Sequence, residues 1–335
     1  MKDRFRIIDL IRGYAALGVV LFHYSNHTLR TIIPNDFSDI FQYGKYGVQA
    51  FFVISGFVIP YSMTKNKYHI KDFFNTLLRR YLRIAPPAYI SIVLMFILYT
   101  APILILGRPL DGIDSWWPGF NFLAIFANFT FTVPFLNTSW YNIVFWTLAI
   151  EFQFYIVVGI LFPMKLKEKT WHIIITITAI LLLGYISFEW FFSYGSFFIL
   201  GFILFLRKEE LFPKNYIYIL SIISLLFCFH QNILPAFISG LVTFIVIFID
   251  PNITTKFSDH LGKVSYSLYL THLPVGNMLE IIIKRIVDIN ESPFIQLLTL
   301  FAYTGLAILF ASIFYHYIEK PSINYSKRIK LSNKQ

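Results

Sequence analysis

Polar segments divide this sequence into long apolar runs, and that pattern decides what the chain can fold into. A helix that crosses a lipid bilayer needs about 20 mostly apolar residues. Because backbone groups find no water in lipid, such runs have to fold as helices. The sequence therefore predicts an all-α integral membrane protein, a bundle of about ten transmembrane helices. The ten runs are residues 7–27, 44–63, 86–107, 140–163, 172–188, 190–206, 214–229, 233–249, 264–283 and 293–317.

The composition supports this class. Hydrophobic residues make up 57% of the chain and charged residues 14%, and the mean hydropathy is +0.64. A soluble domain carries roughly 25% charged residues. The only cysteine, Cys228, excludes an internal disulfide and a cysteine metal cluster, and the histidine spacing is not that of a metal site. We expect one transmembrane domain over 1–335 with a cytoplasmic tail at 320–335 and no separate soluble domain.

The positive charge is unevenly distributed between the runs. The net charge is +10, which in a soluble chain would suggest nucleic acid as a partner. With the N-terminus placed inside, 22 of the 28 Lys and Arg residues fall on the cytoplasmic side, and Arg12 lies within the first run. Cytoplasmic loops carry such an excess. The pattern predicts ten spans with both ends cytoplasmic, and no nucleic acid partner. The five on the outer side are Arg30, Lys45, Arg108, Lys284 and Arg285.

Two further apolar segments are not typical spans. Residues 120–135 are short and contain Asn128 and Pro134, so we expect an interfacial or re-entrant segment. Residues 69–85 combine apolar and basic side chains, which predicts an amphipathic helix in the cytoplasmic interface. We expect Pro86 and Pro87 to end that helix and to begin the third span.

Ionisable side chains within the spans are candidates for function, since each costs at least about 2.5–3.5 kcal/mol at mid-bilayer. Arg12 and His23 are eleven residues apart, so they share one helix face about 16 Å apart. Alternatively, Arg12 reaches the interface and His23 only packs. Glu151 either pairs with an arginine from another span or orients and charges His23.

His272 and the arginines near the third span have two interpretations each. Pro274 should break the helix and free a carbonyl, to which His272 would bond in a structural role; a catalytic role is the alternative. Arg80 and Arg83 are spaced i, i+3 and share a face, so they suit a phosphate-rich ligand. Anchoring to lipid headgroups is the other interpretation.

Six segments together resemble the membrane-bound acyltransferase-3 family, whose members O-acetylate bacterial surface glycans. The resemblance covers nearly the whole chain, and six motifs in order are specific although each alone is weak. Thr147 departs from the serine usual in the family. The segments are Arg6 to His23 with its basic residue and histidine, Gly44 to Phe57, the Arg-x-x-Arg loop from Arg80 to Pro86, Trp146 to Tyr155, Ser265 to Pro274, and Ile318 to Pro321.

This resemblance implies an acyltransferase of the bacterial inner membrane. The donor would be acyl-CoA, usually acetyl-CoA, with no permanently bound cofactor and no metal, because thiolate is a good leaving group. The acceptor would be a sugar hydroxyl of a surface polysaccharide or glycolipid, such as a lipopolysaccharide or exopolysaccharide; membrane lipid and glycan-assembly proteins are further possible partners.

The resemblance also implies roles for single residues. Arg80 and Arg83 would hold the CoA phosphates, and the pantetheine arm would pass Arg12. His23 would act as general base, oriented by Glu151, or would carry the acyl group itself. Arg12 or Tyr266 would donate to the oxyanion, and His272 would be a further residue of the pocket.

A transporter of a glycan or small solute is the main alternative. Buried Arg, Glu and His residues fit a transport path as well. The sequence contains no inverted repeat and no paired broken helices, which argues against it. An assembly partner of a glycan synthase is a third interpretation, but it would not need a titratable histidine.

Overall fold

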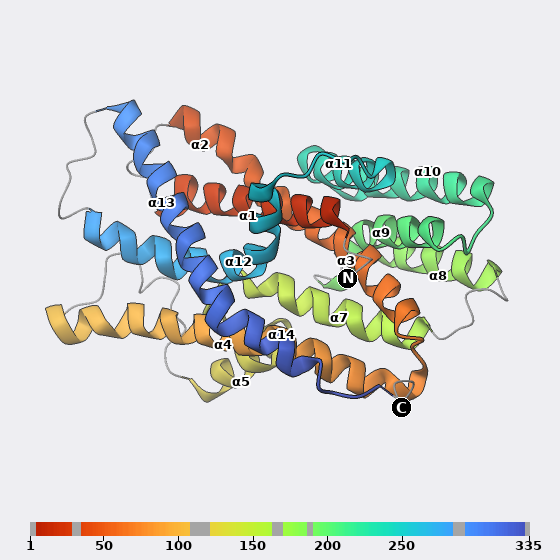
Figure 1. Ribbon diagram of the computed structural model, residues 1–335, viewed down its shortest axis with the longest axis horizontal. Helices are drawn as coiled ribbons and strands as arrows, with labels where there is room; N and C mark the ends of the chain where they lie inside the picture. The colour runs from red at the N-terminus through yellow and green to blue at the C-terminus, as the bar shows by residue number, and fades with distance from the viewer. Residues whose placement is uncertain are drawn as a thin grey trace.

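The computed structural model describes residues 5–28, 35–107, 121–162, 170–185, 190–283 and 292–331, and these residues form helices and no strands. Most helices run roughly along one direction, and α13 crosses them obliquely (Figure 1). The helices are α1 Arg6–His23, α2 Asn35–Phe41, α3 Gly47–Lys65, α4 Phe73–Leu106, α5 Phe122–Thr130, α6 Val133–Leu136, α7 Phe145–Leu161, α8 Thr170–Leu183, α9 Gly195–Lys208, α10 Lys214–Gln231, α11 Leu234–Ile249, α12 Lys256–Ile283, α13 Pro293–Phe314 and α14 Lys320–Ser326.

The surface of the bundle is suited to lipid. Large apolar side chains face outward along whole helices, for example Ile222 and Leu226 on α10 and Leu298 and Leu309 on α13. A monomeric soluble protein rarely exposes so large an apolar surface to water. Within the described ranges, five helical segments are long and apolar enough to cross a membrane, so the chain is a membrane protein. They are Arg6–Asn26, Phe37–Lys65, Ile70–Thr100, Phe191–Lys208 and Pro293–Ser326.

The ten predicted spans are therefore supported in part. Each of the ten ranges overlaps a helix, but the other helices are shorter or more polar than a typical span, and their crossing stays a prediction. Residues 120–135 contain the nine-residue α5 and the four-residue α6. Both are too short to cross a bilayer, in keeping with the expectation that this segment is not a span.

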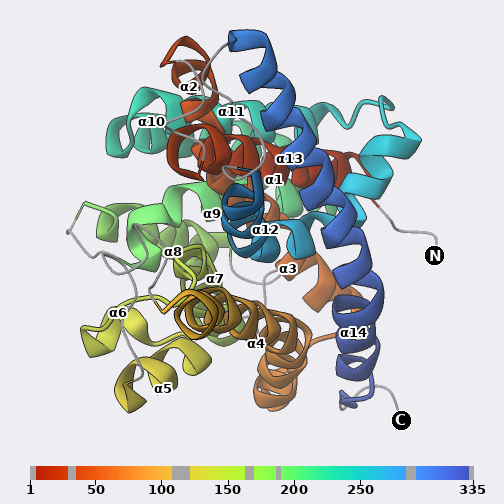
Figure 2. The same cartoon turned by 90° about the vertical axis from the view of Figure 1, so that its left-hand side faces the viewer.

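The predicted break at Pro86 and Pro87 is wrong, because α4 continues through both prolines from Phe73 to Leu106. The two prolines lack the N–H groups that would bond to the carbonyls of Leu82 and Arg83. The Ser322 hydroxyl donates to the Leu82 carbonyl at 2.6 Å and to the Arg83 carbonyl at 3.4 Å. Ser322 belongs to α14, which packs beside α4 (Figure 2). The predicted amphipathic helix is thus the first part of one long helix.

Pro274 likewise lies inside a continuous helix, α12, so the break predicted there is also wrong. Its missing N–H frees the Leu270 carbonyl. The side-chain amide of Asn142 donates to that carbonyl at 3.0 Å. His272 bonds instead to the Leu268 carbonyl, with Nδ1 at 3.2 Å. A side chain from a distant segment therefore preserves the helix at each proline.

Small residues let the inner helices approach one another. A Cβ added to Gly13 on α1 would lie 2.7 Å from the Cβ of Leu261 on α12. A Cβ on Gly56 of α3 would clash with the Phe198 carbonyl of α9. The sequence pair Ser55-Gly56 therefore marks close helix packing. These contacts hold α1 close to α12 and α3 close to α9.

Candidate functional site

A cavity of about 120 Å³ lies between α1, α3, α4, α7 and α12; we call it the central cavity. Its lining combines charged side chains with aromatic and aliphatic ones. Five of the seven candidate residues from the sequence line it, and the two histidines do not. Its polar lining residues are Arg12, Ser55, Arg80, Arg83, Thr147, Glu151, Tyr155, Ser265, Tyr266 and Tyr269.

Glu151 is held by neighbours on α3 and α7. The Ser55 hydroxyl donates to Glu151 Oε1 at 3.0 Å, and the Tyr155 hydroxyl donates to the same oxygen at 2.6 Å. Glu151 and Tyr155 are one helical turn apart, so their side chains meet on one face of α7. The Arg80 guanidinium lies 5.2 Å from the centre of the Tyr155 ring. Tyr155 therefore contacts both Glu151 and Arg80, and a direct pair between Glu151 and an arginine of another span stays a prediction.

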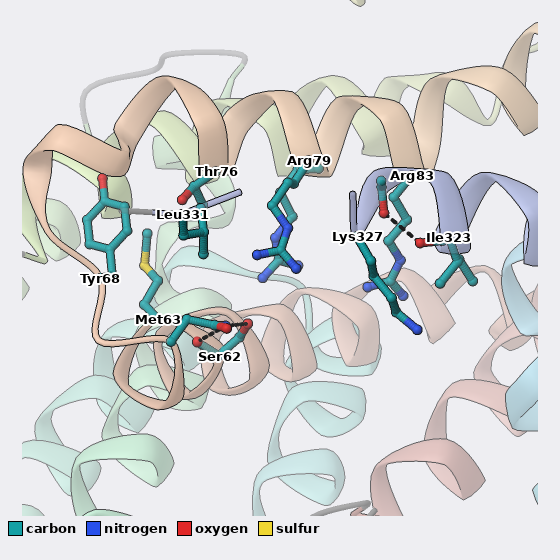
Figure 3. A pocket seen from close by; sticks show the side chains of 12 residues that line it. Ser62, Met63, Tyr68, Thr76, Arg79, Arg83, Ile323, Lys327 and Leu331 are labelled. Carbon is teal, nitrogen blue, oxygen red and sulfur yellow. Dashed lines mark hydrogen bonds between the residues drawn. The ribbon is translucent and has the colours of Figure 1, made fainter. Parts of the chain in front are cut away.

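A second hollow of about 150 Å³ adjoins the first; we call it the arginine cleft. Arg79 and Arg83 extend from α4, and Lys327 extends from the segment after α14, into the space beside Ser62 of α3 (Figure 3). Arg80 also lines this cleft. The twelve lining residues bring four cations and no carboxylate. Such a site favours an anion with several oxygen atoms.

Arg80 and Arg83 line both the arginine cleft and the central cavity. Their i, i+3 spacing places them on one face of α4, as the sequence predicted. Among the described residues, Arg12 and Arg83 form no side-chain hydrogen bond, so their N–H groups are available to a ligand. Buried donors without partners are costly. The two hollows therefore share a wall that the guanidinium groups of Arg80 and Arg83 form.

Tyr68 closes one side of the arginine cleft. Its hydroxyl donates to the Gly159 carbonyl at 2.8 Å. Burial, and secondly the charge of Asp72, raise the pKa of Tyr68 to about 12. The phenol therefore stays neutral at physiological pH and adds no negative charge to the cleft.

Tyr266 lines the central cavity, but its hydroxyl donates to the Ile84 carbonyl at 2.8 Å. That hydrogen is therefore already used in this structure. Arg12 lines the same cavity and has free N–H groups among the described residues. Which of the two would donate to an oxyanion stays a prediction.

Glu319 is a member of the site that sequence reasoning did not single out. Its side chain is only 3% exposed and accepts from the Ser267 backbone N–H at 3.1 Å and the Ser267 hydroxyl at 2.6 Å. It interacts electrostatically with Arg12 and Arg83. The signal was present, since a carboxylate at the end of an apolar run is as costly as Glu151.

His23 lies apart from the central cavity, at the end of α1, and its ring centre is 5.1 Å from that of His272. Phe51 and Tyr269 line the cavity wall, and their ring centres are 5.8 Å apart. The ring centre of Tyr269 is 6.0 Å from that of His272. The expected passage from Arg12 to His23 thus meets an aromatic pair. Glu151 accepts its hydrogen bonds from Ser55 and Tyr155. The imidazole that lies beside His23 is that of His272.

Comparison with known proteins adds relatives of stated activity. The putative peptidoglycan O-acetyltransferase YrhL of Bacillus subtilis is 30% identical over 162 residues, which is 45% of this chain and 22% of the relative. The O-acetyltransferase OatA of Staphylococcus aureus (strain NCTC 8325 / PS 47) is 29% identical over 161 residues, 47% of this chain and 24% of the relative. The peptidoglycan O-acetyltransferase OatA of Listeria monocytogenes is 28% identical over 163 residues, which is 45% of this chain and 23% of the relative. The matched part thus spans less than a quarter of each relative.

No solved structure is significantly similar to this chain. The profile of the acyltransferase-3 family, described as an acyltransferase domain, matches residues 5–316. That match includes every candidate residue from Arg12 to His272 and all the helices that line the central cavity. The chain therefore belongs to the acyltransferase-3 family.

Proposed function

We propose that this membrane acyltransferase moves an acetyl or other short acyl group from acyl-CoA to a sugar hydroxyl of a cell-surface glycan. One observation carries the proposal most directly: Arg80 and Arg83 line both the arginine cleft and the central cavity. A donor with a phosphate-rich head and a long thin arm suits that combination. The head would occupy the cationic cleft and the arm would extend into the bundle.

The arginine cleft would hold the phosphates of CoA. Arg79 and Lys327 join the two arginines expected from the sequence. Guanidinium groups bind phosphate oxygens in pairs, and the ammonium adds a point charge. If the protein lies in the bacterial inner membrane with both ends of the chain on the cytoplasmic side, this cleft would face the cytoplasm, which supplies acyl-CoA.

Transfer would use His23 as general base. Its imidazole would take the proton of the sugar hydroxyl while the oxygen attacks the thioester carbonyl. Arg12, about 16 Å from His23 along α1, would contact the pantetheine arm on its way to the imidazole. When the tetrahedral intermediate collapses, the C–S bond breaks, and the thiolate of CoA receives the proton from the His23 imidazolium. To reach His23, the thioester has to pass Phe51 and Tyr269, so this pair would move when donor and acceptor bind.

The acceptor class follows from the relatives by analogy. Two of them are named as peptidoglycan O-acetyltransferases, which supports testing peptidoglycan sugars before lipopolysaccharide or exopolysaccharide. A lipid-linked glycan would also reach a membrane-embedded site. An assay of the purified protein with each of these glycans identifies the acceptor class.

The proposal is tested with purified protein in detergent micelles. We expect release of free thiol from acetyl-CoA that depends on a peptidoglycan-derived or lipid-linked saccharide, with the acetyl group found on the sugar by mass spectrometry. His23→Ala should lower the rate at least 100-fold, as loss of a general base does. The matched control is His260→Ala, which removes an exposed histidine bonded to Ser312 on the far side of α12. Acceptor-independent thiol release, or full activity of His23→Ala, would overturn the assignment.

A further inference from the structure

The two ring nitrogens of His272 have different surroundings. Nδ1 lies 3.2 Å from the Leu268 carbonyl oxygen. A carbonyl only accepts, so Nδ1 carries the proton in this contact. In the neutral ring Nε2 is then a bare acceptor, and a charged ring would leave an unpaired buried donor instead. Nε2 is buried and has no hydrogen-bond partner.

The position of His272 is fixed by its backbone. The Tyr24 hydroxyl donates to the His272 carbonyl at 2.8 Å, and Asn142 donates to the nearby Leu270 carbonyl at 3.0 Å. The side chain is fully buried, with the Tyr269 ring centre 6.0 Å away. A fixed ring with one free acceptor nitrogen is suited to orienting a neighbour.

That neighbour is His23. The two ring centres are 5.1 Å apart and the planes are inclined by 43°. Two imidazoles joined by an N–H···N bond of about 3 Å have centres roughly 5 Å apart, since each nitrogen lies about 1 Å from its ring centre. The separation is therefore already that of a bonded pair, and a rotation of the His23 ring is enough to direct an N–H at Nε2. Such contacts often tighten only when substrate binds.

We propose that His272 is the positioning residue of the catalytic histidine: its Nε2 accepts a hydrogen bond from one ring nitrogen of His23. This inference rests on the proposed function, and it gives His272 the orienting role first expected of Glu151. With one nitrogen of His23 protonated toward His272, the other is unprotonated and takes the hydroxyl proton. The same bond then stabilises the imidazolium of His23 until the thiolate takes the proton.

The test uses the full chain in detergent and compares His272→Leu with His272→Gln. Leucine removes the acceptor, and we expect a roughly 10- to 100-fold lower kcat with the KM for acetyl-CoA unchanged. Glutamine places an amide oxygen near the position of Nε2, and we expect it to restore kcat to within about fivefold. A merely structural histidine would not be rescued in kcat by an acceptor while both variants keep the wild-type melting temperature.

A double-mutant cycle with His23 separates this inference from the proposed function. If His272 acts through His23, adding His272→Leu to His23→Ala produces no further loss. A further loss of tenfold or more, or a kcat unaffected by His272→Leu, overturns the inference while thiol release by the wild-type protein still supports the transferase. His260→Leu, the same change on the same helix, should leave kcat unchanged. Absence of transfer by the wild-type protein would instead reject the proposed function.

Discussion

Three guanidinium groups, those of Arg12, Arg80 and Arg83, surround the central cavity inside an apolar bundle. Each charge has to be compensated, since an isolated cation in lipid is costly. Glu151 and Glu319 supply negative charge near these arginines. The site is thus arranged as cations with few fixed partners, which leaves them available to an anionic ligand.

Replacing Arg83 by alanine should weaken donor binding selectively. Loss of a charged hydrogen bond costs about 1.5–3 kcal/mol, so we expect the KM for acetyl-CoA to rise about 10- to 100-fold. The KM for the acceptor should change little, because Arg83 lies in the arginine cleft. Arg328→Ala is the control, since Arg328 is exposed and packs on Tyr325 outside the cleft. An unchanged donor KM would return Arg83 to lipid anchoring.

Glu319→Gln should destabilise the protein while keeping the shape of the side chain. The amide oxygen can still accept from Ser267, but Arg12 and Arg83 lose a negative neighbour, at a cost of about 1–3 kcal/mol. We expect a melting temperature several degrees lower in detergent. Added CoA should raise it more than in the wild-type protein, because the ligand supplies the missing negative charge. Glu209→Gln, outside the site, should have no such effect; equal CoA shifts in Glu319→Gln and wild type would contradict the idea.

At the scale of helices, the site depends on two proline-containing elements that remain straight. Ser322 compensates α4 at Pro86 and Pro87, and Asn142 compensates α12 at Pro274. Arg80 and Arg83 lie within the two turns before the first of these prolines. The direction of α4 at that point therefore decides where both arginines point.

Ser322→Ala should disturb α4 and, through it, the donor site. The Leu82 carbonyl loses its donor, and we expect a loss of about 1–2 kcal/mol in stability together with a higher KM for acetyl-CoA. Pro86→Ala restores a backbone N–H for that carbonyl. In the Pro86→Ala background the effect of Ser322→Ala on the melting temperature should be clearly smaller. Equal effects in both backgrounds would show that Ser322 does not act through this carbonyl.

In the whole molecule, the arginine cleft lies where α4 begins and α14 ends. The charge distribution along the sequence predicts that this end faces the cytoplasm. The exposed Asp39 on α2 lies on the predicted outer side. The orientation of the bundle therefore decides which compartment supplies the donor.

Cysteine labelling tests that orientation. In a Cys228→Ser background, Asp39→Cys should react with a membrane-impermeant maleimide on intact spheroplasts. Lys330→Cys, close to the arginine cleft, should react only after lysis. The wild-type protein, in which Cys228 is buried, serves as the unlabelled control. The reverse pattern would place the cleft outside and remove access to cytoplasmic acyl-CoA.

The local features of the site could be predicted, and the long-range ones could not. The spacing of Arg80 and Arg83 was enough to place them on one face, and polarity within an apolar run was enough to single out Arg12 and Glu151. The helix breaks at the prolines were mispredicted because the compensating donors are far away in sequence, Ser322 being 240 residues from Leu82. The pairing of His23 with His272 is of the same kind, since it joins the first helix to α12.

The bond from Ser322 to α4 also has a consequence for biosynthesis. A chain that is inserted into the membrane as it leaves the ribosome places α4 early, yet the hydroxyl of Ser322, 240 residues after Leu82, and the ammonium of Lys327 are made much later. Until then the carbonyls beside the two prolines need a substitute, such as water or a lipid headgroup. A nascent protein would consequently bind no donor before α14 has docked on α4, and a bulky fusion placed directly after Ser326 would interfere at that moment.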